Sequence, residues 1–174
     1  MILRPPRNGY KDQGTYTEIH KNKEYLIESF QIINDKEEYL ECTFVQPKNE
    51  ADRTGDLMPC VIYSHGNDGN KLQGLEYWKQ LADQGINLCT FDFSGCGNSE
   101  GDLVTLGHKE KYDLYSVIDH IKENFRVSEI GLWGRSMGAA TSILYLSNEL
   151  GEANCIVLDS GFSSLDKIMN SLIE

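Results

Sequence analysis

Basic residues and long apolar runs are both scarce in this sequence of 174 residues. Lys and Arg total 16 against 27 Asp and Glu, so the formal net charge is −11. This balance argues against nucleic acid or an anionic membrane surface as a partner, because neither attracts a negative protein. Apolar runs such as Cys155–Leu158 are too short to span a bilayer, and Pro5 and Pro6 interrupt the N-terminus before any apolar core of signal-peptide length. We therefore expect a soluble, cytoplasmic protein with no transmembrane segment.

Paired cysteines and clustered metal ligands are also lacking. The cysteine count is five, which is odd, and no two cysteines have C-x-x-C spacing. Most of them lie in or beside apolar stretches with the pattern of strands, where a free thiol acts as a small buried hydrophobe. The histidines are scattered along the chain, with no ligand pair at a useful spacing. We predict reduced, structural thiols and no metal site.

The N-terminal part of the chain has the pattern of an irregular lead-in followed by a hairpin. Residues 1–16 are rich in Pro, Gly and charge and predict no regular element. Extended stretches are predicted over Tyr25–Ile33 and Tyr39–Gln46, separated by a turn at residues 34–36. The polar run that follows predicts an exposed loop. Residues 17–174 are expected to form one domain.

From Pro59 onwards the sequence repeats a unit of strand, glycine turn and helix. The predicted strands are Cys60–Tyr63, Ile86–Phe93, Glu129–Trp133 and Cys155–Leu158, and the predicted helices cover residues 72–82, 114–125, 139–144 and 165–173. This alternation predicts right-handed crossovers and a mostly parallel sheet with helices on both faces. The hairpin adds an antiparallel edge. In such folds chemistry gathers beyond the carboxyl ends of the strands, where each glycine-rich turn lies.

Three kinds of site compete for these glycine turns. A dinucleotide-binding site needs G-x-G-x-x-G, but after Gly95 and Gly97 the third glycine position holds Glu100. A phosphate-binding P-loop needs Gly-Lys-Ser/Thr, and residues 69–72 read G-N-K-L. Residues 134–138 read G-R-S-M-G, the G-x-S-x-G pattern of a nucleophile elbow. Only the third pattern is complete.

The elbow interpretation rests on the elements around Ser136. A nucleophile elbow places its serine in a strained turn between a strand and a helix, and the flanking glycines avoid collisions there. Residues 130–133 supply the predicted strand and residues 139–146 the predicted helix. The competing interpretation is that Ser136 is only the N-cap of that helix, since Ser is a favoured capping residue. The full strand–turn–helix context favours a nucleophile.

An acyl-transfer site also needs hydrogen-bond donors for the oxyanion that forms on the substrate. The backbone N–H of Met137, which follows the nucleophile at a helix N-terminus, is the first candidate. The turn S-H-G-N-D-G at residues 64–69 follows an earlier strand, and Gly66 would let the N–H of Asn67 point to the same oxygen. The competing interpretation of His65 and Asn67 is ordinary turn chemistry.

Other polar side chains near these turns are interpreted as structural. Asp92 ends a strand and is expected to organise the following loop by hydrogen bonds. His108 and His120 are expected to be surface or packing residues, and Trp133 a core residue. Arg135 is either a group at the mouth of the site or a solvated arginine.

The sequence resembles the α/β-hydrolase superfamily, most closely the serine aminopeptidase-like hydrolases of plants, protists and bacteria. The matching motifs are R-P-P-R at 4–7, C-V-I-Y-S-H-G-N at 60–67, F-D-F-S-G-C-G-N-S-E-G at 91–101, I-G-L-W-G-R-S-M-G-A at 130–139 and I-V-L-D-S-G-F-S-S-L at 156–165. The resemblance implies a three-layer α/β-hydrolase fold. It also implies Ser136 as the nucleophile, Asn67 and Met137 as the oxyanion hole, and no cofactor. The implied function is a serine hydrolase that acts through an acyl-enzyme on a small ester, thioester or peptide-like substrate.

One departure from the family pattern concerns the catalytic acid and base. In this superfamily both follow the nucleophile along the chain, on later strands, in the order acid and then histidine. No histidine follows Ser136, and Asp159, which ends a strand, is at a position used only occasionally for the acid. We therefore expect the N-terminal portion of a hydrolase domain, without the last two strands, and little turnover by this chain alone. The alternative function is an inactive hydrolase fragment with at most a binding role.

The same departure predicts how the chain behaves in solution. Cys155–Leu158 would stand at an open edge of the sheet. Unpaired backbone groups beside apolar side chains promote association between strands. We expect self-association through this edge.

Overall fold

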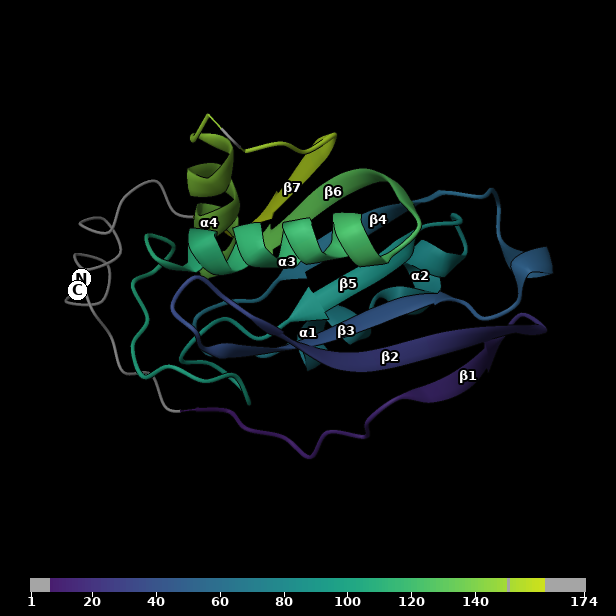
Figure 1. The fold of residues 1–174 in the computed structure, drawn as a ribbon, viewed down its shortest axis with the longest axis horizontal. Helices are drawn as coiled ribbons and strands as arrows, with labels where there is room; N and C mark the ends of the chain where they lie inside the picture. Colours follow the sequence, from purple (N-terminus) through teal and green to yellow (C-terminus); the bar gives the residue numbers. More distant parts are fainter. Residues whose placement is uncertain (1–6, 150, 162–174) are drawn as a thin grey trace.

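One twisted sheet with helices on both faces makes up the protein (Figure 1). The computed structural model describes residues 7–149 and 151–161, so the helix predicted over residues 165–173 lies outside the described residues. Within these residues the sheet has seven strands in the order β1-β2-β3-β5-β4-β6-β7. This arrangement confirms the predicted mixed, mostly parallel α/β class.

The first three strands are antiparallel. They are β1 (Tyr16–His20), β2 (Lys23–Ile33) and β3 (Tyr39–Pro47). The turn between β2 and β3 is the predicted one: the Asn34 side-chain oxygen accepts hydrogen bonds from the N–H groups of Lys36 and Glu38 at 2.9 and 3.0 Å. The predicted hairpin is thereby confirmed.

The strand β1 was not predicted, because its inward positions are mostly polar and its most apolar side chain points to solvent. The side chains that face the protein are Tyr16, Glu18 and His20, whereas Ile19 points outward and is 73% exposed. An edge strand with polar inward positions has no hydropathy signal. The sequence signal that could have found β1 is Asn22, a typical turn residue, and in the structure Lys21 and Asn22 have φ of 48° and 63°. Two consecutive residues with positive φ are typical of a tight hairpin turn.

The remaining strands are parallel to one another. They are β4 (Met58–Ser64), β5 (Asn87–Phe91), β6 (Val127–Arg135) and β7 (Cys155–Asp159). The helices α3 (Glu110–Asn124) and α4 (Met137–Leu146) pack on one face, and α1 (Leu72–Leu75) and α2 (Trp78–Ala82) on the other (Figure 1). A short 3-10 helix, η1 (Glu50–Asp52), lies in the polar loop before β4.

The predicted helix over residues 72–82 is instead two short helices. The break falls between α1 and α2, where Tyr77 has φ −102° and ψ −2°. Gly74 of α1 lies so close to β5 that a Cβ there would be 2.5 Å from the Thr90 hydroxyl oxygen, so α1 packs directly on the sheet. The predicted stop at Gly85 is confirmed by its φ of 71°.

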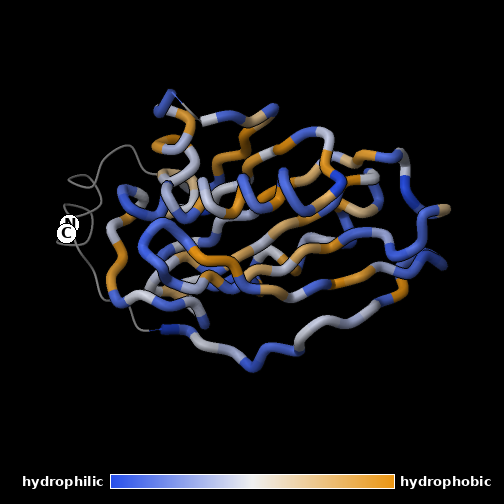
Figure 2. Tube along the Cα trace, in the orientation of Figure 1, coloured by the Kyte–Doolittle hydropathy of each residue, from blue (hydrophilic) through white to orange (hydrophobic). Residues whose placement is uncertain are grey.

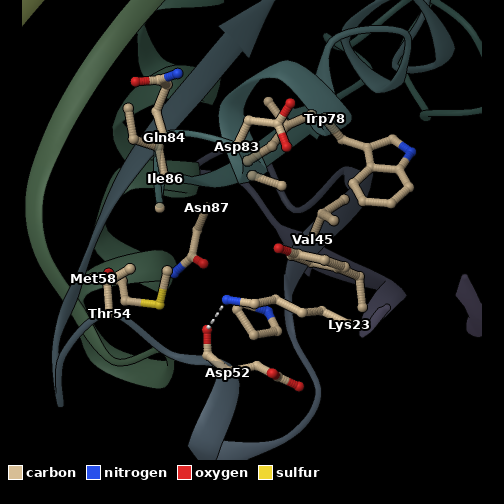
Figure 3. A pocket seen from close by; sticks show the side chains of 15 residues that line it. Lys23, Val45, Asp52, Thr54, Met58, Trp78, Asp83, Gln84, Ile86 and Asn87 are labelled. Carbon is tan, nitrogen blue, oxygen red and sulfur yellow. Dashed lines mark hydrogen bonds between the residues drawn. The ribbon is translucent and has the colours of Figure 1, made fainter. Parts of the chain in front are cut away.

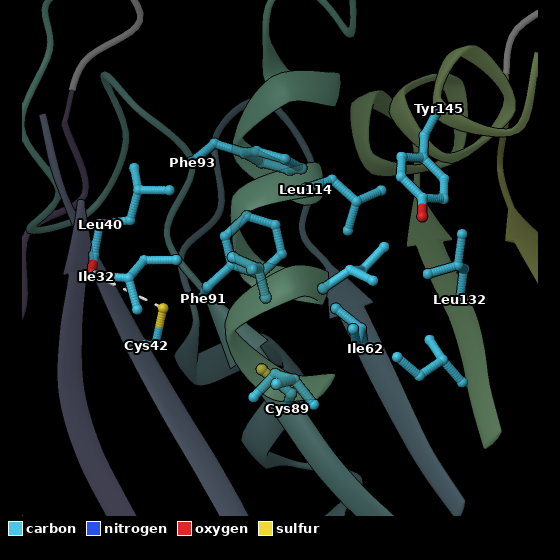
Figure 4. Packing of buried hydrophobic residues seen from close by; sticks show 14 of the residues in the cluster. Ile32, Leu40, Cys42, Ile62, Cys89, Phe91, Phe93, Leu114, Leu132 and Tyr145 are labelled. Carbon is cyan, nitrogen blue, oxygen red and sulfur yellow. Dashed lines mark hydrogen bonds between the residues drawn. The ribbon is translucent and has the colours of Figure 1, made fainter. Parts of the chain in front are cut away.

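Two apolar clusters fill the space on either side of the sheet. Ile62 of β4 faces α3 and α4, and the next residue, Tyr63, faces α2. Figure 4 shows Leu114 of α3 and Tyr145 of α4 pointing toward the strands that carry Ile62 and Leu132. Hydrophobic residues accordingly follow the central strands, while the connecting loops are mostly hydrophilic (Figure 2).

All the cysteines are free thiols, and every one except Cys155 is buried. Burial raises the pKa of the Cys96 thiol to about 12, and burial also raises the pKa of the Cys60 thiol. Thiols held in the neutral form are poor nucleophiles. The four buried thiols pack as hydrophobes, as predicted, whereas Cys155 is exposed.

The strand β7 is the outermost strand described. Its side chains at Ile156, Val157 and Leu158 are 37%, 51% and 45% exposed. Association through this edge stays a prediction.

Candidate active site

Ser136 lies in a strained turn where β6 meets α4. Its backbone has φ 52° and ψ −109°, a region that residues other than glycine rarely adopt. Its N–H donates a hydrogen bond to the backbone oxygen of Asp159, 2.8 Å away at the end of β7. The Ser136 side chain makes no capping hydrogen bond to α4, which removes the N-cap interpretation. Such strain persists only where the surrounding structure holds it, and it is concentrated at functional sites.

The two glycines of the motif allow this turn to form. A Cβ on Gly138 would collide with the backbone oxygen of Ser64 in β4, and one on Gly134 would collide with the backbone of Gly138. The helix can therefore begin directly against the central strand. Ser136 therefore lies at the carboxyl end of the sheet, between β6 and α4, where its side chain is partly exposed.

The turn after β4 lies beside Ser136. A Cβ on Gly66 would be 3.7 Å from the Ser136 Cβ, so Gly66 is in direct contact with the elbow. Asn67 is the residue that follows Gly66. The N–H of Gly69 closes this turn by donating to the Gly66 oxygen at 2.9 Å. Met137 is the first residue of α4, and the first N–H groups of a helix have no acceptor within it. The structure thus brings Asn67, Ser136 and Met137 to one place.

His65 is fully buried and uses both ring nitrogens to hold the loops. The N–H of Phe93 donates to its Nε2 at 3.1 Å, so Nε2 carries no proton. The proton is therefore on Nδ1, which donates to the Gly66 oxygen at 2.6 Å. Burial lowers the pKa of His65 below its ordinary value. His65 is a neutral crosslink between the turns after β4 and β5, and it is not positioned as a base for Ser136.

Asp92 organises the loop after β5, as predicted. Its side-chain oxygens accept hydrogen bonds from the N–H of Lys71 at 2.5 Å, the N–H of Asn98 at 2.8 Å and the hydroxyl of Tyr10 at 2.8 Å. Its backbone oxygen accepts a further hydrogen bond from the Ser99 hydroxyl at 2.7 Å. The carboxylate is completely buried, and hydrogen bonds to a buried charge are what make its burial tolerable. Asp92 therefore ties the α1 turn, its own loop and the N-terminal segment together.

Asp159 and Arg135 lie next to each other at the end of the last two described strands. The Asp159 carboxylate is 3.8 Å from Arg135 Nε and accepts a hydrogen bond from the Ser160 hydroxyl at 2.8 Å. The Arg135 side chain is 51% exposed, which supports the solvated interpretation. Trp133 is only partly buried and packs against Tyr77 with ring centroids 4.6 Å apart.

The other histidines make no contact with the elbow among those found in the described residues. His20 bonds Asp83 at 2.8 Å, and His120 stacks on Phe30 with ring centroids 5.2 Å apart. His108 is exposed. The expectation that His108 and His120 are surface or packing residues is confirmed. Among the hydrogen bonds of the described residues, none joins a histidine to Ser136.

A family model for the serine aminopeptidases of family S33 matches residues 57–173, which include every element of this site. The chain belongs to this family of α/β-hydrolases. Its strand–elbow–helix unit and the turn beside it are thus parts of a hydrolase domain.

Relatives and solved structures agree with this assignment. An uncharacterized protein YfhR of Salmonella typhi is 32% identical over 133 residues, covering 70% of this chain and 45% of the relative. The lysophosphatidylserine lipase ABHD12 of Gallus gallus is 29% identical over 119 residues, covering 66% of this chain and 31% of the lipase. The Pyrococcus furiosus esterase Pf2001 superposes with a TM-score of 0.74 at 26% identity, covering 97% of this chain and 63% of the esterase.

The chain covers only part of the length of these proteins. It spans between 31% and 45% of the length of the first curated relatives it matches. No helix among residues 7–149 and 151–161 has the length and apolarity to cross a bilayer. In the same residues no group of three or more His, Cys, Asp or Glu side chains is arranged to hold a metal ion.

The residue that the sequence did not reveal is Lys71. Its side chain is 1% exposed, and its Nζ lies 2.7 Å from Asp12 and 3.7 Å from Glu41. Although burial acts to raise the pKa of Asp12, the hydrogen bonds from Lys71 and from the Gly14 N–H hold that pKa below its ordinary value. The Lys71–Asp12 pair thus fixes the segment before β1 against the loop between β4 and α1. A lone lysine after a glycine turn gives no sequence signal for such a role.

Proposed function

We propose that this chain carries the nucleophile and the oxyanion hole of a serine hydrolase that acts on ester, thioester or amide bonds. The observation that carries the proposal is the strained backbone of Ser136 at the end of β6, with the Gly66 turn against it. A strained serine beside two sets of backbone N–H groups suits attack on a carbonyl carbon. The esterase and lipase names among the family relatives support the same class of reaction.

In the proposed reaction the Ser136 Oγ attacks the carbonyl carbon of the substrate while a base takes its proton. The N–H groups of Met137 and Asn67 donate to the oxyanion of the tetrahedral intermediate. The intermediate collapses with loss of the alcohol, thiol or amine, which takes up the proton, and water then releases the acid from the acyl-enzyme. Both ring nitrogens of His65 are engaged in hydrogen bonds to the loops, so His65 is not proposed as this base.

The proposed substrate is a small ester, thioester or peptide-like molecule, and the proposed location is the cytoplasm. The location rests on the free thiols, of which four are buried and none is paired among the described residues. Secreted proteins more often pair their cysteines.

Labelling with a fluorophosphonate probe tests the nucleophile without requiring turnover. The probe reacts at the serine oxygen with loss of fluoride, and this reaction should be slow here because a serine hydroxyl without an adjacent base is a weak nucleophile. We expect mass spectrometry to find the label on Ser136, and the Ser136→Ala variant to remain unlabelled. The matched control is Ser160→Ala, which removes another hydroxyl at positive φ (54°) near the same strand ends and should leave labelling unchanged.

The alternative function is a binding role without catalysis. Labelling of Ser136→Ala at the rate of the unmodified chain would reject Ser136 as the nucleophile. Absence of any label on Ser136 after prolonged reaction would favour the binding role. Hydrolysis of p-nitrophenyl butyrate by the chain should be slow, with any Ser136-dependent part well below the rates of ordinary esterases.

A further inference from the structure

A cavity of about 290 Å³ lies at the end of the sheet opposite to Ser136. Figure 3 shows the side chains that line it. Its walls come from the first residues of β4 and β5, Met58 and Asn87, and from the strands β2 and β3 and the end of α2. The Gly66 turn and the elbow follow the last residues of β4 and β6 instead. The cavity is therefore separate from the hydrolase site.

The cavity contains a buried carboxamide with no partner. Asn87 is 2% exposed, and neither its Nδ2 nor its Oδ1 has a hydrogen-bond partner within the part of the chain that the structure describes. Figure 3 shows this carboxamide pointing into the cavity between Met58 and Lys23. A buried polar group without a partner costs free energy, so such groups are rare and call for an explanation. A ligand that pairs with the amide supplies one.

The remaining walls favour a neutral ligand with an apolar body. Val45, Met58, Trp78 and Leu88 give apolar surface. Of the charged side chains that line the cavity, Asp83 pairs with His20 at 2.8 Å and with Lys21 at 2.7 Å, and the Lys23 ammonium donates to the backbone oxygen of Asp52 at 3.4 Å. The Trp78 ring is held against Tyr25, with centroids 5.2 Å apart, which gives the cavity a fixed aromatic wall.

We propose that this cavity binds a small planar molecule that carries a neutral carboxamide or lactam. Its carbonyl oxygen accepts a hydrogen bond from Asn87 Nδ2, and its N–H donates to Asn87 Oδ1. Only a group with a donor beside an acceptor satisfies both atoms. A carboxylate has no donor for Oδ1, and a hydrocarbon satisfies neither atom. The volume suits a single ring, at the lower end of ligand pockets in general.

Binding is tested with benzamide, benzoate and toluene, three rings of similar size, by ¹H–¹⁵N NMR of the isotope-labelled 174-residue chain. We expect benzamide at millimolar concentration to give saturable shifts in the Asn87 side-chain amide and in the N–H groups of Met58 and Leu88. Shifts at Ser136 and Met137 should be absent, which separates this site from the hydrolase site. Benzoate and toluene should bind about tenfold more weakly or not at all.

Variants at Asn87 sharpen the test. Asn87→Leu should abolish saturable benzamide binding, and Asn87→Asp, which keeps the shape but loses the donor, should weaken it about tenfold. Gln84→Ala, at the exposed rim of the same cavity, is the control that should keep binding. The proposal is overturned if benzamide gives no saturable shift, if all three rings bind equally, or if Asn87→Leu binds benzamide as the unmodified chain does.

Discussion

Asn34 and Asn87 are two buried asparagines at opposite ends of the same sheet. Asn34 lies near the active-site end, and its side chain donates to Asp113 at 2.8 Å while its oxygen accepts two backbone N–H groups. Asn87 lies at the other end with both side-chain atoms unpaired among the described residues. Burial is nearly the same, 5% and 2% exposed.

The difference reflects what each end of the sheet does. At the active-site end, Asp92, His65 and Asn34 use their polar atoms to fix loops, so that a strained serine is held in place. At the other end Asn87 has no hydrogen-bond partner among the described residues, so its hydrogen-bonding capacity is free. A fully bonded polar group points to a scaffold, and a buried group without a partner points to a ligand.

The largest expected loss of stability comes from a substitution in the elbow. Gly138→Ala should destabilise the protein by about 3 kcal/mol or more, because the new Cβ would collide with the backbone of Ser64. Gly66→Ala is the matched control at the same site, since its Cβ would meet its nearest atoms at 3.7 Å, an ordinary contact, and should cost less than about 1 kcal/mol. Urea unfolding measures both. Equal effects for the two variants would contradict the close packing of α4 on β4.

The next effect is the loss of the buried carboxylate that fixes the loops. Asp92→Asn should lower the unfolding free energy by about 2–4 kcal/mol, because an amide cannot accept the hydrogen bonds of Lys71, Asn98 and Tyr10 together. Asp68→Asn, on the exposed surface of the neighbouring turn, should change it by about 0.5 kcal/mol or less. If both substitutions cost the same, Asp92 is not the organiser of this end.

The comparison of the two asparagines has a direct test. Asn34→Leu should cost about 1–3 kcal/mol, since Asp113 and two backbone N–H groups lose their partner. Asn87→Leu should be neutral or slightly stabilising, because it removes two atoms that have no partner to lose. Thermal unfolding of the two variants, without added ligand, measures the difference. A large loss for Asn87→Leu would mean that its amide is part of the scaffold after all.

The smallest expected effect is a pH dependence that comes from His65. Burial lowers its folded-state pKa, so in the folded protein the ring stays neutral as the pH falls through 6.5, whereas the unfolded chain takes up a proton. Stability should therefore decrease as the pH falls below about 6.5.

The ¹⁵N shifts of the His65 ring give the direct measurement. They should show the tautomer with the proton on Nδ1, and they should not change between pH 7.5 and 6. His120 also has a lowered pKa from burial, and His120→Asn removes its share of the stability effect. A His65 ring that titrates near 6.5 would place it in contact with solvent and reopen its role as a base.

Several features of the site could be predicted because their signals are local. The elbow is a run of five residues between a strand pattern and a helix pattern, and the structure has Ser136 in the expected turn. Asp92 was predicted to organise its loop because it stands where a strand ends. Its partners could not be predicted, since Lys71 and Tyr10 are 21 and 82 residues away and neither has a motif.

Local patterns failed where packing across the sheet overrules them. The strand β1 has polar side chains on its inner face, so alternation gave no signal, and pairing with β2 forms it nevertheless. The helical spacing of residues 72–82 predicted one helix, but the chain forms two, and the first packs closely on β5 where Gly74 meets Thr90. Contacts with other strands of the sheet are not visible in a local pattern.

Composition and periodicity thus decided the α/β class, the place of the elbow and the buried thiols, because each depends on a residue and its near neighbours. The tertiary structure decided which polar groups are free. In the sequence His65 belongs to the predicted oxyanion turn, and in the structure it is a neutral crosslink, since Phe93 and Gly66 occupy its nitrogens. Asn87 reads as an ordinary strand residue and is an unpaired amide in a cavity. A hydrogen bond needs two atoms about 3 Å apart, and only the folded chain fixes which atoms those are.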